Sequence, residues 1–170
     1  MRVSTVSARS VRELRRRRDA PPRRDRQTGG DHPWEYVVGS LARYDVQSDG
    51  TVGVRNTCRT IVGTTSAVTG RTRSENPPAD SVLTVSFLKL GGRWIYLGGP
   101  NYVVIGLDPD YRWAVVGDPD RSTGFVLSRE PALTGAQTTA AKAALTANGY
   151  DLCDFRTTRQ DGGGQAGSFC

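Results

Sequence analysis

Two tight turns built around proline constrain the fold of this chain more than any other feature of its sequence. The first is Asp108-Pro109-Asp110 and the second spans residues 118–122; they separate apolar runs at 101–107, 111–117 and 123–129. Proline and aspartate favour such turns, and connections this short leave no room for a crossover helix. We therefore expect neighbouring runs to pair as antiparallel strands.

Short strand-like runs fill the region from residue 35 onward. Each is rich in β-branched and aromatic residues and is bounded by Gly, Pro, Asn or Asp, which is typical of an antiparallel meander. Seven such runs are present, at residues 36–47, 51–59, 60–73, 81–89, 101–107, 111–117 and 123–129. The first two flank Ser48-Asp49-Gly50, where the glycine supplies the positive φ of a hairpin turn.

A single helix is predicted after the last of these runs. Thr134 and Gln137 form a T-x-x-Q capping box, and Asn148-Gly149 ends the alanine-rich segment that follows. The runs at 111–117 and 123–129 are apolar on both faces, which requires cover on the outer face of the sheet. We expect the helix to provide that cover through its small side chains, namely Ala136, Ala140, Ala143, Ala144 and Ala147.

The length of the meander favours closure. A long antiparallel sheet must protect its edges and bury its inner face, and one helix cannot cover all of it. We expect an all-β, antiparallel up-and-down barrel with one C-terminal helix packed outside. A barrel of about eight strands has an interior large enough for one small ligand. No run of about 18 apolar residues exists in the sequence, so no spanning helix is predicted.

Charge divides the chain into a basic tail and a neutral body. The net charge is +6, yet residues 1–30 hold ten Arg against three acidic residues, and the other 140 residues carry 13 basic and 14 acidic side chains. We interpret residues 1–34 as a disordered Arg-rich tail, 35–158 as the barrel with its helix, and 159–170 as a flexible Gly-rich tail. The Arg-rich tail, as written, lacks the apolar core of a signal peptide.

Four motifs follow one another in the second half of the chain. They are L-D-P-D-Y at 107–111, W-A-V-V-G-D-P at 113–119, L-S-R-E-P at 127–131 and G-Y-D at 149–151. In this order they resemble the bacterial lipocalins, and the resemblance covers roughly residues 36–158. It implies an eight-stranded barrel that binds and carries a small hydrophobic or lipid-like ligand, such as a fatty acid or lysolipid, in an extracytoplasmic or secreted location.

The first strand of such a barrel is missing or atypical here, so that only seven strands are evident. Lipocalins open with a G-x-W motif, whose Trp closes the barrel base against the arginine that ends the last strand; Arg129 matches that arginine. No G-x-W precedes Tyr36, and we expect a misplaced start or a reading-frame error upstream of about residue 35. Open strand edges are then expected to give a weak homodimer.

Alternate positions on three neighbouring strands are assigned to the barrel lumen, where they form the ligand-binding wall. These positions are Tyr102, Val104, Trp113, Val115, Phe125 and Leu127. The alternative is a solid apolar core, but the resemblance favours an open cavity. Arg129 is interpreted as a structural residue of the barrel base rather than as a cation that binds the ligand.

The cysteines do not indicate a metal site. Cys58, Cys153 and Cys170 lack CxxC spacing, and His32 is the only histidine. One disulfide with one odd thiol is compatible with these residues and with an oxidising compartment. The resemblance implies that this disulfide joins Cys58 to Cys153 and leaves Cys170 free.

Neither a cofactor nor an enzymatic activity is predicted. No nucleophile motif lies near a credible base, and the acidic residues of the two turns flank prolines, where Asp commonly caps its own backbone; these are Asp108, Asp110, Asp118 and Asp120. The alternative function is that of a nucleic-acid-associated protein acting through the Arg-rich tail. No folded module or interleaved aromatic residues support it, so no specific nucleic-acid partner is expected.

Overall fold

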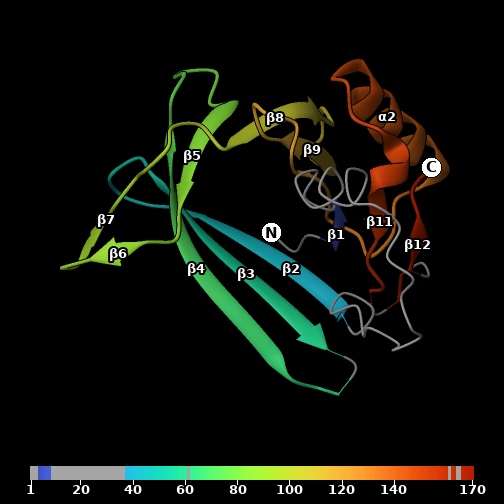
Figure 1. Ribbon diagram of the computed structural model, residues 1–170, viewed down its shortest axis with the longest axis horizontal. Helices are drawn as coiled ribbons and strands as arrows, with labels where there is room; N and C mark the ends of the chain where they lie inside the picture. Colours follow the sequence, from blue (N-terminus) through green and yellow to red (C-terminus); the bar gives the residue numbers. More distant parts are fainter. Residues whose placement is uncertain (1–3, 9–36, 61, 161, 164–165) are drawn as a thin grey trace, which may run out of the picture.

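The computed structural model describes residues 4–8, 37–60, 62–160, 162–163 and 166–170 (Figure 1). Its first strands are β1 (Ser4–Ala8), β2 (Val37–Val46), β3 (Val52–Thr60), β4 (Thr65–Ser74), β5 (Val82–Ser86), β6 (Lys89–Leu90) and β7 (Arg93–Trp94). The remaining elements are β8 (Tyr102–Leu107), β9 (Trp113–Gly117), β10 (Gly124–Ser128), the helix α2 (Gly135–Ala147), the short 3-10 helix η2 (Leu152–Asp154), β11 (Phe155–Thr157) and β12 (Gly167–Ser168).

One antiparallel sheet dominates the fold. Its strands follow the order β12-β11-β1-β10-β9-β8-β5-β4-β3-β2, and β6 pairs with β7 in a separate small hairpin. The seven strands from β2 to β10, with the β6–β7 hairpin set aside, correspond to the seven predicted runs and curl into a half-barrel, with β2–β4 facing β8–β10 across it (Figure 1). The predicted β-meander with a single helix outside is confirmed.

The proline turns adopt the structure that their sequence predicts. β8 pairs with β9 and β9 with β10, both antiparallel. The Asp108 carboxylate accepts hydrogen bonds from the backbone amides of Asp110 and Arg112 at 3.2 and 3.1 Å. Asp118 does the same for the amide of Thr123 at 2.9 Å. Each aspartate therefore caps its own turn, as expected.

Residues 4–8 form a strand, contrary to the expectation that all of 1–34 is a disordered tail. β1 lies between β10 and β11 and pairs with both, for example Ser4 with Ser128 and Val6 with Thr157. A strand therefore takes the place beside β10 that the absent G-x-W motif left open. The rest of the predicted tail, including His32 and Trp34, lies outside the described residues.

The segment after the helix is also more ordered than predicted. β12 pairs with β11, and the Phe169 side chain is only 4% exposed, although residues 159–170 were expected to form a flexible tail. The Phe169 ring packs against Phe155 with 6.5 Å between ring centroids. The high glycine content of this segment predicted flexibility, but the one aromatic side chain in it, Phe169, is buried and holds the segment against the core. Burial of an aromatic ring removes a large apolar surface from water.

The helix covers the outer face of the sheet, as predicted, but through a different set of side chains. The Thr134–Gln137 capping box is present in both directions. Ala141 and Leu145 are fully buried, whereas most of the alanines assigned to the sheet side are exposed. Ala144 packs closely on Gly106 of β8: a Cβ atom added to Gly106 would lie 2.8 Å from the methyl group of Ala144. Leu145 therefore sets the rotation of the helix, because it has the largest apolar surface to bury.

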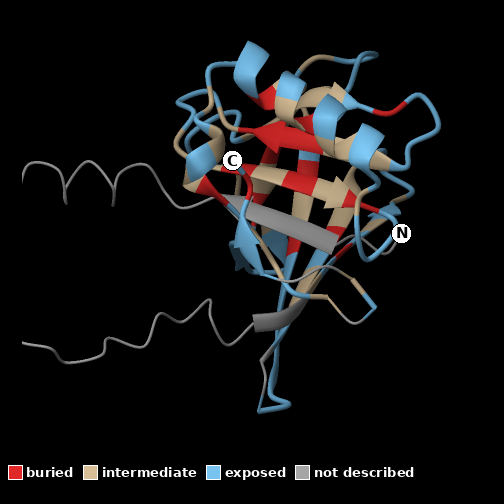
Figure 2. Ribbon diagram, turned by 90° about the vertical axis from the view of Figure 1, so that its right-hand side faces the viewer, coloured by how far each residue is buried: buried red, intermediate tan, exposed pale blue. Residues whose placement is uncertain are grey.

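The main hydrophobic core lies between α2 and the sheet rather than inside the half-barrel. It consists of Val115, Val126, Ala141, Leu145, Phe155 and Phe169, with Trp113 and Ile105 packed against it. Figure 2 shows buried residues gathered beneath the helix, whereas the far end of the β3–β4 hairpin is exposed. The inner face of the half-barrel is thus left to line a cavity. No described helix is long and apolar enough to cross a membrane.

Candidate ligand-binding pocket

The curled sheet encloses a pocket of 380 Å³ between β2, β3, β5, β8 and β10. This volume lies within the usual range for a small-molecule site. Its apolar wall consists of Leu41, Ala42, Val54, Val85, Phe87, Phe125 and Leu127. The polar lining residues are Ser40, Tyr44, Asn56, Thr57, Cys58, Asn101 and Tyr102, so no lining residue carries a charged side chain.

Strand pairing explains why most of these side chains share one face. Residues directly opposite one another in an antiparallel ladder point to the same side of the sheet. Tyr44 faces Val54 across the β2–β3 ladder, whereas Leu41 faces Thr57 at positions of the opposite parity on the same two strands. Phe87 closes over Gly70, where a Cβ atom would lie 2.7 Å from its ring. A side chain at residue 70 would therefore push this aromatic wall of the pocket out of place.

Three of the six predicted lumen residues line the pocket. Tyr102 contributes from β8, and Phe125 and Leu127 contribute from β10. Val104 pairs with Val116, which in turn faces Phe125, so Val104 shares the inner face without reaching the pocket lining. The predicted alternation therefore holds on β8 and β10.

The assignment of Trp113 and Val115 to the lumen is wrong. Phe125 faces Val116 across the β9–β10 ladder, so Val115 points outward; it is fully buried in the core under α2. Trp113 packs against the same core. Both faces of β9 are apolar, and a strand covered on both sides gives no alternation from which its inner face can be read.

A pair of tyrosines forms the polar position of the pocket. The hydroxyl oxygens of Tyr44 and Tyr102 lie 3.0 Å apart and share a hydrogen bond. Burial raises the pKa of both phenols above the usual value, so both stay neutral. Only one of the two hydroxyl hydrogens is needed for the mutual bond, which leaves the second for a ligand.

Asn56 provides an acceptor in the same cavity. Its Oδ1 atom is buried and has no hydrogen-bond partner among the described residues, and the side chain lines the pocket. A buried amide oxygen without a partner is costly. Sequence reasoning missed Tyr44 and Asn56. The tyrosine lies on a predicted strand, but the polar residues of β3 opposite it show no alternation of apolar side chains from which an inner face could be predicted.

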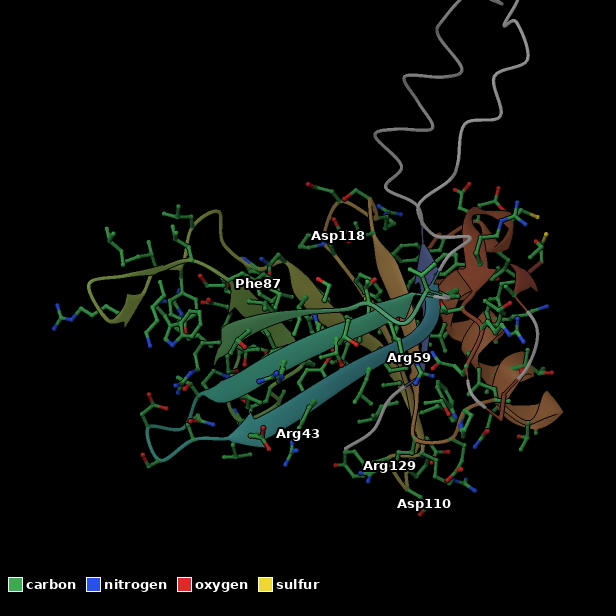
Figure 3. All side chains as sticks on the ribbon, turned by 90° about the horizontal axis from the view of Figure 1, so that it is seen from below. Arg43, Arg59, Phe87, Asp110, Asp118 and Arg129 are labelled. Atoms are coloured by element: carbon green, nitrogen blue, oxygen red, sulfur yellow. The ribbon has the colours of Figure 1, made fainter. Side chains whose placement is uncertain are left out.

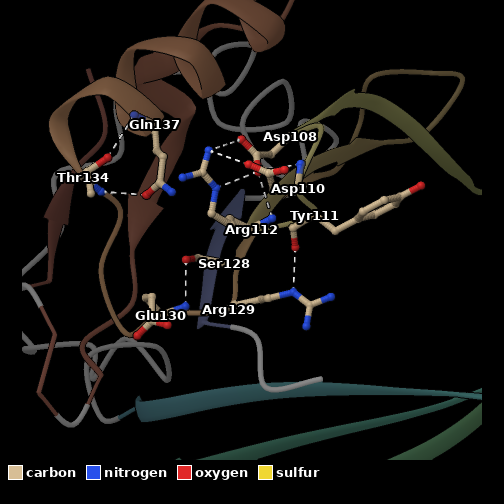
Figure 4. Close-up of polar contacts among 9 residues, drawn as sticks. All are labelled: Asp108, Asp110, Tyr111, Arg112, Ser128, Arg129, Glu130, Thr134 and Gln137. Carbon is tan, nitrogen blue, oxygen red and sulfur yellow. Dashed lines mark hydrogen bonds and ion pairs between the residues drawn. The ribbon is translucent and has the colours of Figure 1, made fainter.

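Arg129 lies at the end of the half-barrel that carries the β8–β9 turn. Its Nε atom donates a 2.7 Å hydrogen bond to the carbonyl of Tyr111, and its guanidinium is exposed (Figure 4). Figure 3 shows it near Asp110 and well away from Phe87. Arg129 is absent from the pocket lining. Trp34, the only tryptophan near the position of the G-x-W motif, lies outside the described residues, so the role of Arg129 at a barrel base stays a prediction.

The structure does not contain the predicted Cys58–Cys153 disulfide, and the two residues have different neighbours. All three cysteines are exposed free thiols. Cys58 lies on β3 against Ser40, with 3.6 Å between Sγ and Oγ, and lines the pocket. Cys153 instead has Cys170 as its neighbour, and that thiol raises the pKa of Cys153. In the described part of the chain, no group of three or more His, Cys, Asp or Glu residues is arranged to hold a metal ion.

Comparison with known proteins identifies the family. A lipocalin-like domain model matches residues 34–160. The chain belongs to the lipocalin-like family. The outer membrane lipoprotein Blc of Escherichia coli K12 is 31% identical over 134 residues, which cover 78% of this chain and 72% of Blc. Blc of Citrobacter freundii is 29% identical over 137 residues, with the same coverage.

Solved lipocalin structures show the same fold. The cockroach allergen Per a 4 superposes with a TM-score of 0.57 at 14% identity, over 94% of this chain and 83% of the allergen. Apocrustacyanin C2 gives a TM-score of 0.56 at 13% identity, over 94% and 76%. Membership of the family supports binding of small hydrophobic ligands by this lipocalin. Nothing in these comparisons supports the nucleic-acid alternative.

Proposed function

We propose that this lipocalin binds and carries one lipid-like molecule, such as a fatty acid or a lysolipid, with the acyl chain inside the pocket and the charged head group outside. The observation that carries the proposal is the pocket wall, which is apolar over most of its area and has no charged lining residue. Each methylene group taken from water into such a wall contributes about 0.8 kcal/mol. A buried carboxylate or phosphate would find no counter-ion there.

The polar groups of the pocket give the ligand an orientation. The Tyr44–Tyr102 pair offers one hydroxyl donor, and Asn56 offers an unpaired carbonyl oxygen. A neutral hydroxyl or ester group on the ligand satisfies these atoms, because it supplies an acceptor or a donor without the cost of burying a charge. The pocket therefore favours an apolar chain that carries one uncharged polar group.

The role is carriage rather than catalysis, and we propose that it is performed outside the cytoplasm. The pocket holds no nucleophile next to a base: its one thiol, Cys58, contacts the hydroxyl of Ser40. The Blc relatives are outer membrane lipoproteins, which supports an extracytoplasmic location for this chain.

A fluorescent fatty-acid analogue tests the proposal. We expect it to bind the full chain and to be displaced by long-chain lipids, and we expect Leu127→Arg to reduce the affinity at least about tenfold, since an unpaired guanidinium would enter the apolar wall. Val46→Arg is the matched control, because Val46 is a valine on β2 that is 82% exposed and outside the lining. Equal affinity in both variants, or no binding by the full chain, would contradict the proposal.

A further inference from the structure

Two cysteines that are far apart in sequence are brought together beside the core. β11 and β12 pair through Arg156 with Ser168 and Thr157 with Gly167, and the amide of Phe169 donates to the carbonyl of Phe155 at 3.1 Å. Continuing this register by one step places Cys170 next to the end of η2, which holds Cys153. The residue opposite Cys170 is then Asp154, the chain neighbour of Cys153, and each of the two thiols shifts the pKa of the other.

Independent contacts fix the backbone of each cysteine. The amide of Cys153 donates to the carboxylate of Asp151 at 2.9 Å. On the other side, Lys142 donates to the carbonyl of Cys170 at 3.3 Å, and its Nζ atom lies 5.3 Å from the centroid of the buried Phe169 ring. The thiols themselves are exposed. The pair is therefore held together by its surroundings and is open to reagents in solution.

The two thiols differ in acidity. A hydrogen bond from Cys153 to Cys170, together with partial desolvation and the nearby carboxylates of Asp151 and Asp154, raises the pKa of Cys153 to about 11. The same bond, and a second one from the Ser168 hydroxyl, with 2.9 Å between Oγ and Sγ, lower the pKa of Cys170. Cys170 is thus the thiol that ionises first, and the thiolate is the reactive form.

We propose that Cys153 and Cys170 form the disulfide of this chain by exchange with a small-molecule disulfide, and that Cys58 stays a free thiol in the pocket wall. The Cys170 thiolate attacks one sulfur of the oxidant, forms a mixed disulfide and releases the first thiolate. Cys153 then loses its proton to water, and its sulfur displaces the second thiolate. Both released thiolates gain a proton, so that two protein thiols are oxidised and one small disulfide is reduced to two thiols.

The bond would close a loop between Cys153 and Cys170, and this loop contacts a residue of the pocket lining. Between the two cysteines the chain passes Gln160, whose Nε2 atom donates to the carbonyl of Ser40 at 3.3 Å, and Ser40 lines the pocket. It also passes Gly163, where a Cβ atom would lie 2.5 Å from the carbonyl of Pro131. Oxidation would therefore hold both contacts in place and stabilise the β2 side of the cavity.

Peptide mapping of the full chain after treatment with oxidised glutathione tests the proposal. Trypsin cuts after Arg55, Arg59, Lys142, Arg156 and Arg159, so the three cysteines fall on separate peptides. We expect one linked pair, Cys153 with Cys170, and alkylated Cys58. Cys58→Ser should keep the link and Cys170→Ser should abolish it. A link that contains Cys58, or three alkylated cysteines, would overturn the proposal.

Alkylation rates of the reduced protein test the order of the two steps. We expect iodoacetamide at pH 7 to modify Cys170 several-fold faster than Cys153, and we expect Cys153→Ser to slow the reaction of Cys170. Faster modification of Cys153 would refute Cys170 as the attacking thiol. Oxidation should also raise the Tm by about 5 °C or more, in the wild type and in Cys58→Ser but not in Cys153→Ser. If the Tm of the disulfide-linked protein is unchanged, the disulfide does not stabilise the contacts of this loop.

Discussion

The hydroxyl of Tyr150 lies against Gly117, in the space that a side chain at that position would fill. There it accepts a hydrogen bond from the amide of Asp118 at 3.1 Å and is 3.1 Å from the carbonyl oxygen of Thr123, to which it donates. Burial raises the pKa of Tyr150, so the phenol keeps its proton. The contact ties the segment after α2 to both sides of the β9–β10 turn and explains the glycine at position 117.

Gly117→Ala is expected to lower the free energy of unfolding by about 1–3 kcal/mol, because the new methyl group displaces the Tyr150 hydroxyl. Tyr150→Phe should cost about 1–3 kcal/mol by leaving the Asp118 amide without its partner. In the double variant the two losses should add incompletely. Urea denaturation measures all three. Gly135→Ala is the control, since nothing lies within 4 Å of a Cβ atom there; a Gly117 variant as stable as this control would contradict the contact.

Sequence predicted the parts of the fold that rest on local chemistry. The proline turns, the Gly50 hairpin and the Thr134 capping box are each specified by a few adjacent residues, and all are present. β1 was missed because Ser4–Ala8 is short and is surrounded by arginines. Its pairing partners, β10 and β11, lie more than a hundred residues away, and no local pattern encodes that contact.

The pocket was predictable only where one face of a strand is more apolar than the other. On β10 both faces carry apolar residues, but they differ in size, because Phe125 and Leu127 alternate with Gly124, Val126 and Ser128. The prediction failed on β9, since Trp113 and Val115 lie under the helix whereas Val116 faces the lumen. The tyrosine pair depends on two strands that meet across the cavity, 58 positions apart in the chain.

The Tyr44–Tyr102 pair is expected to select among ligands. Tyr102→Phe leaves one hydroxyl without its partner and removes an acceptor, so we expect the affinity for a hydroxylated or esterified chain to fall about five- to tenfold. The affinity for a plain hydrocarbon chain of equal length should hardly change. Titration calorimetry with the two ligands measures the difference. Tyr111→Phe is the control, because that side chain is 57% exposed and does not line the pocket; equal losses for both ligands would argue against a polar role for the pair.

Stability is expected to fall in acid through Asp108. The Arg112 side chain donates hydrogen bonds to the Asp108 carboxylate at 2.9 and 3.1 Å, and these bonds, helped by two backbone amides, lower the pKa of Asp108 (Figure 4). A carboxyl whose pKa is lower in the folded state stabilises the fold above its unfolded pKa of about 3.9, and the contribution is lost as the pH falls through the folded pKa.

Thermal melting between pH 2 and pH 7 checks this dependence. Asp108→Asn should melt lower than the wild type at pH 7, and the gap should narrow as the pH falls below about 4. Asp110→Asn is the matched control, because the Asp110 carboxylate is 74% exposed and its contact with Arg112 is longer, at 3.4 Å. A gap that stays constant across the range would mean that ionisation of Asp108 does not stabilise the turn.

The place of β1 predicts what its removal will do. β1 supplies backbone hydrogen bonds to β10 on one side and to β11 on the other. Its loss therefore leaves one edge of β10 and one edge of β11 unpaired. We expect deletion of residues 1–8 to lower the Tm by about 5 °C or more and to promote concentration-dependent association, seen by size-exclusion chromatography. Deletion of residues 1–3 keeps the strand and serves as the control. If both truncated chains are monomeric and melt at the temperature of the full chain, β1 contributes nothing to closing the sheet.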